Sequence, residues 1–415
     1  METTLKLLKD LIKFDTSNPP ADTRGISHYL GRLLERNNIP YRLLKKKGNR
    51  VYKHSFYLLS EIGRGSKCIT LYGHSDVVPV GELSKWDSDP FTPVERDGRV
   101  YGRGSTDMKS GLAVLVSTYM ELAKERGKLG GRVQLLVCPD EENYLNKEKL
   151  LPEIIAKHET NACIMAEPHS SIMIGEKGEM WLKFIAKGKA AHGSTPYAGE
   201  DAGIILNDAI EEIRKIVNRL NYGYSKRQIK IRDLLEEADK NMAEEFGLTG
   251  KRRASFVKNR PSSRITMNVG YVRIGHNINV VPDEAEAHIS FVMPYGFDYM
   301  SLKGRILKMF SGYEGKIAVT LFGGSNATMT DARSGLVKAM VESYKEVHGA
   351  DPKITFNTST SDAMFYRRVG IPTILHGPGR LAMAHKNNEF VEIADLEPAK
   401  RVFLKAVKKF LATKS

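Results

Sequence analysis

CITLYGHSD, residues 68–76, is a short apolar run that turns abruptly polar at its end. The apolar part predicts a buried β-strand, and the polar tail carries His74 and Asp76. Two further runs of this form end in acidic residues, namely residues 132–138 before Asp140-Glu141-Glu142 and residues 161–166 before Glu167. In open α/β sheets, ligands bind beyond the carboxyl ends of the strands. The three runs therefore predict one site at one edge of a sheet.

Strand-like and helical segments alternate around these runs, which favours an α/β fold. The expected helices of this part are residues 4–13, 26–37, 109–125 and 394–411. After residue 187 the pattern changes to a long helix near 201–221, strands near 264–273 and 284–293, and a helix near 298–311. We therefore expect a discontinuous larger domain, residues 1–187 and 316–415, with a mainly parallel mixed sheet flanked by helices. Residues 188–315 would form an inserted, smaller α+β two-layer sandwich.

The composition is typical of a globular protein, and the length favours two domains. The chain has 415 residues, of which 41% are hydrophobic and 27% charged. No segment reaches the roughly 18 uncharged apolar residues that a membrane span needs, and the first residues lack a signal-peptide pattern. The three cysteines are far apart and lie in apolar runs, which fits a reducing compartment. We expect a cytoplasmic protein that does not bind a membrane.

The formal net charge of +14 raises the alternative of a nucleic-acid partner. The excess is spread along the chain, with a cluster at residues 225–260 that holds ten Lys or Arg against six Asp or Glu. Such runs usually form a solvated surface, and no basic motif with interleaved aromatic residues is present. We therefore expect no nucleic-acid partner. A surface that attracts acidic substrates is the functional alternative for this cluster.

Five stretches carry imidazole or carboxylate groups, the donors that zinc and harder divalent ions accept. They contain His74 with Asp76, Asp107, Glu141 with Glu142, Glu167, and His385. Each group alone is more often a helix cap or a surface residue. The ordered set, with glycines at the turns, indicates a metal centre.

This set resembles the zinc-dependent peptidases and deacylases, the family of succinyl-diaminopimelate desuccinylase, acetylornithine deacetylase, aminoacylase-1 and glutamate carboxypeptidase. The resemblance covers nearly the whole chain. It rests on residues 73–79, Trp86 with Pro90-Phe91, residues 102–111, Asp140-Glu141-Glu142, Ala166-Glu167-Pro168, residues 191–196, residues 279–283, and His385 with Glu389.

The resemblance implies two metal ions per subunit, zinc by preference, with cobalt or manganese as substitutes. It assigns His74 and Glu167 to one ion, Glu142 and His385 to the other, and Asp107 to both. It also makes the peptide bond after Asp107 a candidate for the cis form.

The resemblance further implies three catalytic residues. Asp76 would accept the second N–H of His74 and fix its tautomer. Glu141 would be the general base that takes a proton from water and passes it to the leaving amine. His192, from the inserted domain, would stabilise the oxyanion, often from the partner subunit of a homodimer. The inserted domain would then act as a lid and as a dimerisation domain.

The substrate is less well defined by the sequence. Asn279 would contact it, but the arginine that many relatives carry before Pro294 is replaced here by Phe291-Val292-Met293. Arg264 or Arg273 is the expected substitute.

The expected activity is hydrolysis of the amide bond of a small N-acyl amino acid or peptide. Desuccinylation of N-succinyl-diaminopimelate, in lysine biosynthesis, is the first interpretation. The alternatives are acetylornithine deacetylase, a metallo-carboxypeptidase or dipeptidase, and a binding protein without turnover. Glu141, the expected base, argues against the last.

Overall fold

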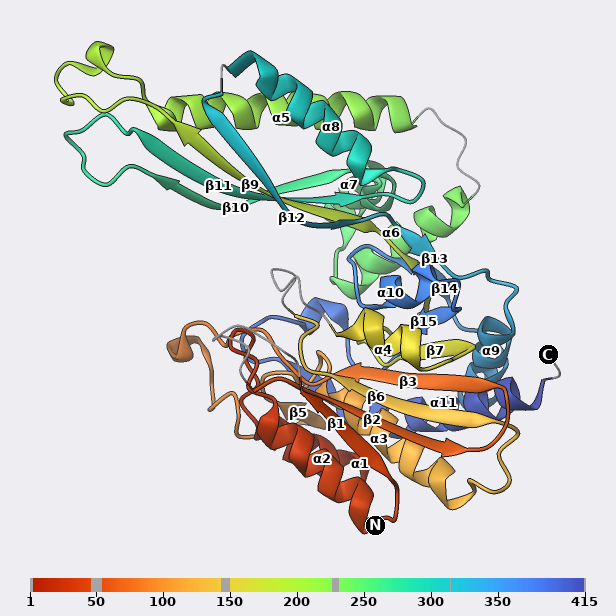
Figure 1. The fold of residues 1–415 in the computed structure, drawn as a ribbon. Helices are drawn as coiled ribbons and strands as arrows, with labels where there is room; N and C mark the ends of the chain where they lie inside the picture. The colour runs from red at the N-terminus through yellow and green to blue at the C-terminus, as the bar shows by residue number, and fades with distance from the viewer. Residues whose placement is uncertain (1–2, 46–53, 143–149, 226–230, 314, 414–415) are drawn as a thin grey trace. The chain divides into compact units, whose positions relative to one another are not determined.

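The computed structural model describes residues 3–45, 54–142, 150–225, 231–313 and 315–413. Two compact units are present (Figure 1). Unit 1 comprises Met1–Gly175, Met329–Thr355 and Ser361–Ser415, and unit 2 comprises Glu176–Thr328 and Phe356–Thr360. In the part of the chain described, no helix is both long enough and apolar enough to cross a bilayer. The three cysteines are buried free thiols.

A nine-stranded mixed sheet forms the centre of unit 1, in the order β1-β2-β6-β3-β7-β15-β8-β13, with β14 paired to β8. Its strands are β1 Tyr41–Lys45, β2 Phe56–Gly63, β3 Cys68–His74, β6 Arg132–Cys138, β7 Ala162–Met165, β8 Ile172–Glu176, β13 Thr328–Met329, β14 Ile354–Asn357 and β15 Thr373–Leu375. The four strands β6, β3, β7 and β15 run parallel, whereas β1, β2 and β8 pair in the antiparallel sense. The predicted α/β class with a mixed sheet is confirmed, and its parallel part comprises these four strands.

Helices cover both faces of this sheet (Figure 1). On one face, α3 (Lys109–Lys124) packs against β3 and β6, with α1 (Thr4–Ile12) and α11 (Leu396–Ala412) beside it and α9 (Gly335–His348) against α11. On the other face, α4 (Leu151–Lys157) and α10 (Ala363–Arg368) bury apolar side chains against alternate residues of β2, β3, β6 and β7. The helix α2 (Arg24–Arg36) packs against β1 and β2.

The parallel strands of unit 1 bring distant polar residues to one edge. His74 ends β3 and lies opposite Cys138, which ends β6, while Tyr72 lies opposite Met165, which ends β7. Because the three strands run in the same direction, the segments that follow them begin side by side. The predicted convergence of the three polar ends is therefore a consequence of strand register.

A small second sheet joins two further segments of unit 1. Its strands are β4 (Val94–Arg96), β5 (Arg99–Tyr101) and β16 (Phe390–Glu392), in the order β16-β5-β4. Tyr101 pairs with Phe390, so the turn that begins at Gly102 lies beside the loop that ends at Glu389. This sheet brings the Asp107 segment next to the His385 segment.

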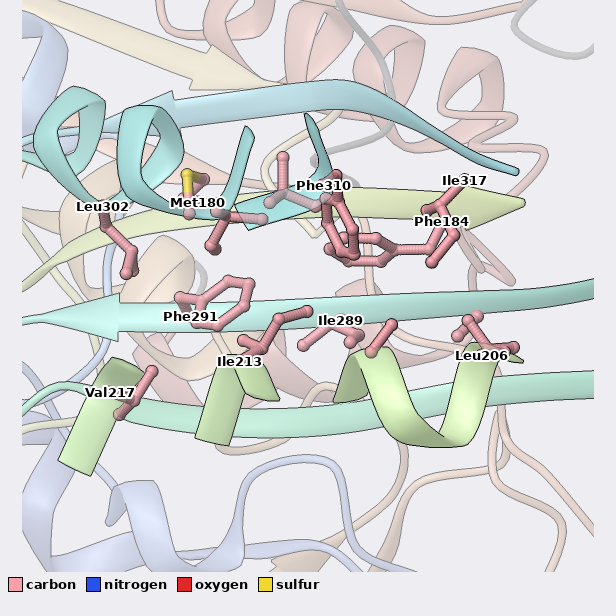
Figure 2. Packing of buried hydrophobic residues seen from close by; sticks show 14 of the residues in the cluster. Met180, Phe184, Leu206, Ile213, Val217, Ile289, Phe291, Leu302, Phe310 and Ile317 are labelled. Atoms are coloured by element: carbon pink, nitrogen blue, oxygen red, sulfur yellow. The ribbon is translucent and has the colours of Figure 1, made fainter. Parts of the chain in front are cut away.

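Unit 2 is an antiparallel sheet covered by helices on one face. Its strands are β9 (Gly178–Lys187), β10 (Thr266–Ile274), β11 (Glu284–Met293) and β12 (Ile317–Ser325), in the order β10-β11-β9-β12. Figure 2 shows α5 (Ala202–Ser225) and α8 (Tyr299–Phe310) packing their apolar side chains onto β9 and β11. Leu206, Ile213 and Val217 of α5 recur at helical spacing, as an amphipathic helix requires. The basic segment contains α6 (Arg232–Glu245) and α7 (Gly250–Asn259), whereas residues 226–230 lie outside the described residues.

Unit 2 extends further in both directions than the domain expected at residues 188–315. The expected larger domain ran to residue 187 and so included both β8 and β9, but these two strands belong to different sheets. The strand β9 pairs instead with β11 and with β12, so all three strands lie in the sheet of unit 2. The pairing partner of a strand is set by long-range packing, which local sequence pattern does not encode.

A candidate metal centre at the ends of parallel strands

The five predicted metal ligands lie in unit 1 and come from five separate segments. His74 ends β3, Glu142 follows β6, and Glu167 follows β7. Asp107 lies in the turn before α3, and His385 lies in the loop before β16. Glycine makes part of this packing possible, because a Cβ atom on Gly111 of α3 would lie 1.9 Å from the carbonyl oxygen of Ala166.

Asp107 presents one carboxylate oxygen to each histidine. Its Oδ1 lies 3.2 Å from Nε2 of His74, and its Oδ2 lies 3.3 Å from Nε2 of His385. Glu142 Oε2 is 3.2 Å from the same nitrogen of His385, while Glu167 Oε1 is 3.9 Å from Nε2 of His74. The side chains thus form two sets of three, and the two sets share Asp107. Ligand atoms of His74, Asp107 and Glu142 all lie within 4.8 Å of one another.

The carboxylate of Asp76 makes more contacts than the single one that we expected with His74. Nδ1 of His74 lies 3.0 Å from the backbone oxygen of Asp76 but 3.5 Å from its carboxylate Oδ1, so the nearer acceptor is the carbonyl. The carboxylate also accepts the backbone N–H groups of Glu141 and Glu142, both at 3.0 Å, and the side-chain amide of Asn18 at 2.7 Å. Asp76 therefore positions the acidic loop as well as the histidine. Nothing in the sequence singled out Asn18, since an asparagine before two prolines reads as a turn residue.

The two histidines are held among carboxylates, which favours their charged forms. Hydrogen bonds to Asp107 and Glu142 raise the pKa of His385 to about 11. Burial opposes the charged form of His74, but its bonds to Asp107 and Asp76 outweigh burial and raise its pKa well above the usual value. Burial likewise opposes ionisation of Asp107, and its bonds to both histidines nevertheless lower the pKa of this carboxyl group.

The pKa values of the two glutamates are raised, in contrast to that of Asp107. Burial raises the pKa of Glu167 to about 8, and the charges of Asp107 and Glu142 act in the same direction. Burial and the charge of Asp107 also raise the pKa of Glu142. The cluster thus holds more negative charge than its two imidazoles can neutralise, and in the absence of a metal ion protons take up the difference.

This donor set fits divalent metal ions. Within the described residues, Oε1 of Glu142 and Oε1 of Glu167 are buried and accept no hydrogen bond. A buried carboxylate oxygen without a partner is costly unless a cation or a proton satisfies it. Nitrogen and oxygen donors in two sets of three, with one carboxylate common to both, suit a pair of zinc ions or similar cations.

Three predicted residues, His192, Asn279 and Arg264, lie in unit 2, and their roles stay predictions. The side chain of His192 is exposed and its Nδ1 lies 2.7 Å from the hydroxyl of Ser194. The backbone oxygen of Asn279 accepts the N–H of Gly193 at 2.7 Å, so Asn279 and His192 lie on adjacent segments. The side chain of Arg264 is exposed, and its backbone oxygen accepts Nζ of the buried Lys177 at 2.7 Å.

The peptide bond between Asp107 and Met108 is cis, as expected. The turn that carries it is fixed from outside by Glu389, which accepts backbone N–H groups of Thr106 and Asp107. The motif around His385 contained Glu389, but the sequence did not indicate which segment it contacts.

The metal-free protein should lose stability as the pH rises from about 4.5 to about 8. The folded protein keeps the Glu167 proton up to a pKa of about 8, whereas the unfolded chain releases it near the ordinary value of 4.5. The folded state therefore binds more protons in this window, and rising pH favours unfolding. Glu167→Gln cannot ionise, and its free energy of unfolding should fall less steeply with pH, by at most about 1.4 kcal/mol per pH unit.

Urea unfolding of the metal-free wild type and Glu167→Gln across this pH range measures the difference. Because His385 contributes a slope of the same sign in both proteins, the comparison isolates Glu167. If the free energies of unfolding of the two proteins changed with pH in the same way, Glu167 would not be the group with the raised pKa.

Comparison with known proteins gives a consistent result. The chain matches peptidase family M20/M25/M40 over residues 70–409. It is 30% identical over 397 residues to a Staphylococcus aureus protein named probable succinyl-diaminopimelate desuccinylase, covering 94% of this chain and 92% of that protein.

Two solved structures share the fold. An M20-family metallo-carboxypeptidase from Sulfolobus solfataricus has a TM-score of 0.82 at 21% identity, covering 100% of both chains. A dinuclear metal-binding M20-family peptidase from Bacillus subtilis has a TM-score of 0.61 at 16% identity, covering 99% of this chain and 98% of that one. With the family match over most of the chain, these findings show that the protein belongs to peptidase family M20/M25/M40, a family of metal-dependent hydrolases.

Proposed function

We propose that the protein is a metal-dependent amidohydrolase that uses two metal ions, zinc by preference, to cleave the amide bond of an N-acyl amino acid. The observation that carries the proposal is the position of Asp107. One of its oxygens faces His74 and the other faces His385, at 3.2 and 3.3 Å. A carboxylate shared in this way is what a pair of adjacent cations requires, and a single cation would leave one of the two sets unused.

His74, Glu167 and Asp107 would hold one cation, and His385, Glu142 and Asp107 would hold the other. Cations bound there supply Lewis acidity, which polarises a carbonyl group and makes water a stronger acid. The donors are all buried except His385, so the site excludes much of the competing solvent.

Glu141 is the proposed general base. It is adjacent to Glu142, whose carboxylate contacts His385, and both backbone N–H groups are fixed by the carboxylate of Asp76. In a loop held this way, adjacent side chains can point in different directions, so that Glu142 can bind metal while Glu141 faces the water. Glu141 would accept a proton from the attacking water and then deliver it to the nitrogen of the leaving amine. His192 would donate a hydrogen bond to the oxyanion.

The proposed substrate is N-succinyl-diaminopimelate, whose desuccinylation belongs to lysine biosynthesis. Support comes from the name of the Staphylococcus aureus relative, which is similar over nearly its whole length. The solved neighbour from Sulfolobus solfataricus is a carboxypeptidase, which keeps peptide cleavage as the second candidate. Acetylornithine deacetylation is a third candidate, because the same chemistry acts on a different acyl group.

Three further expectations accompany this proposal. Unit 2 would act as a lid and as a dimerisation domain, and its edge strand β10 exposes Tyr271, Val272 and Ile274. An exposed edge strand is a ready partner for a second chain, and sedimentation of the purified protein would show whether it is a homodimer. Arg264 and Asn279 would contact the substrate, and the enzyme would be cytoplasmic.

Replacing Glu141 by Gln should lower kcat by about 10²- to 10⁴-fold, because the amide cannot accept the proton of the attacking water. The metal content should stay near two ions per chain, since Glu141 is not in either ligand set. Elemental analysis and steady-state kinetics measure both quantities. Retained activity would remove the proposed base, and turnover absent from the wild type as well would favour a binding protein.

A substrate panel separates the candidate activities. Zinc- or cobalt-loaded protein should hydrolyse N-succinyl-LL-diaminopimelate with a higher kcat/KM than N-acetylornithine or any dipeptide of the panel. Recognition groups that match a substrate's polar ends discriminate strongly against analogues that lack them. Preference for dipeptides would instead assign the chain to the peptidases, with the metal centre unchanged.

A further inference from the structure

We propose that Glu389 is a positioning residue for metal binding, which holds the Asp107 segment and the His385 segment together before a metal ion arrives. The inference rests on the proposed metal centre and concerns a residue outside both ligand sets. It predicts that loss of the Glu389 carboxylate weakens metal binding by the folded protein.

Glu389 is buried, and both of its oxygens are occupied by donors from one turn. Oε1 accepts the backbone N–H groups of Thr106 at 2.9 Å and Asp107 at 3.0 Å. Oε2 accepts the backbone N–H of Gly104 at 3.0 Å and Nη1 of Arg103 at 2.7 Å. Four donors from residues 103–107 thus converge on one carboxylate that belongs to the loop following His385. The carboxylate fixes the backbone of Asp107 itself, the residue shared by both ligand sets.

Arg103 extends this connection to a third segment. Its guanidinium is buried, pairs with Glu389, and also donates to the backbone oxygens of Lys386 at 3.1 Å and Pro79 at 3.3 Å. Lys386 directly follows His385, and Pro79 lies five residues after His74 in the segment that follows β3. The ring of Trp86 lies 5.0 Å from the guanidinium. The buried pair therefore ties together the segments that carry His74, Asp107 and His385.

These contacts bear on affinity for a metal ion and not only on the fold. Without metal, the carboxylates of the centre repel one another, so the ligand segments need an outside restraint to stay in place. A restraint that exists before binding reduces the conformational entropy that the ligand segments lose when a metal ion binds. Residues that orient metal ligands in this way change metal affinity by about 10- to 100-fold when they are removed.

The test compares Glu389→Gln with Glu392→Gln in the full chain. Glu392 lies three residues further along and pairs with Arg99 at 2.8 Å, but this pair is partly exposed. The control thus removes a carboxylate from the same strand region, where the ion pair lost among the described residues is the one with Arg99. Zinc is titrated into the metal-free proteins against a chromophoric chelator, and urea unfolding of the same metal-free proteins is measured in parallel.

Glu389→Gln should bind zinc about 10- to 100-fold more weakly at one or both sites, whereas Glu392→Gln should match the wild type. The inference is overturned if Glu389→Gln loses unfolding free energy but its folded fraction binds two zinc ions as tightly as the wild type. That result would mean that Glu389 stabilises the fold without affecting metal binding, and the proposed function would still stand. A wild-type chain that binds no zinc would overturn the metal centre and this inference together.

If Glu389→Gln does not fold, Arg103→Lys decides the question. Lysine keeps the charge beside Glu389 but cannot reach the backbone oxygens of Lys386 and Pro79 at the same time. A several-fold weaker zinc affinity in folded Arg103→Lys supports the inference, and unchanged affinity overturns it.

Discussion

The site depends on the electrostatic conflict among Asp107, Glu142 and Glu167, three carboxylates gathered around two imidazoles. Burial disfavours every one of these charges, and their mutual repulsion adds to the cost. The opposed pKa shifts express this conflict: both histidines are driven towards their charged forms while Glu167 retains a proton. Divalent cations bound there would resolve it, because they would satisfy the buried oxygens and replace protons at the same time.

Two features of the fold hold these charged groups together. Parallel strands β3, β6 and β7 end at one edge and deliver His74, Glu142 and Glu167. A second set of carboxylates then holds the loops through their backbone N–H groups, with Asp76 on the acidic loop and Glu389 on the Asp107 turn. Backbone groups make effective anchors, since each has a fixed direction and loses little conformational freedom on bonding. Candidate ligands scattered over more than three hundred positions of the sequence are thus held at one place.

The sequence predicted the parts of this arrangement that follow from local pattern. Apolar runs ending in His74, Glu142 and Glu167 predicted strands, and strand direction then predicted a shared edge. Sequence pattern could not predict the partners of β9 and β12, because pairing is decided by packing far along the chain. It also did not predict the bonds of the Asp76 carboxylate to the acidic loop, and it gave no sign of Asn18. Hydrogen bonds between loops depend on three-dimensional distances that residue spacing does not contain.

The most direct test of the central claim is a crystal structure of the zinc-loaded protein with anomalous scattering recorded at the zinc edge. The account predicts two peaks about 3.5–4 Å apart, one beside His74 and Glu167 and the other beside His385 and Glu142, with Asp107 between them. A single peak, or peaks away from Asp107, would contradict it.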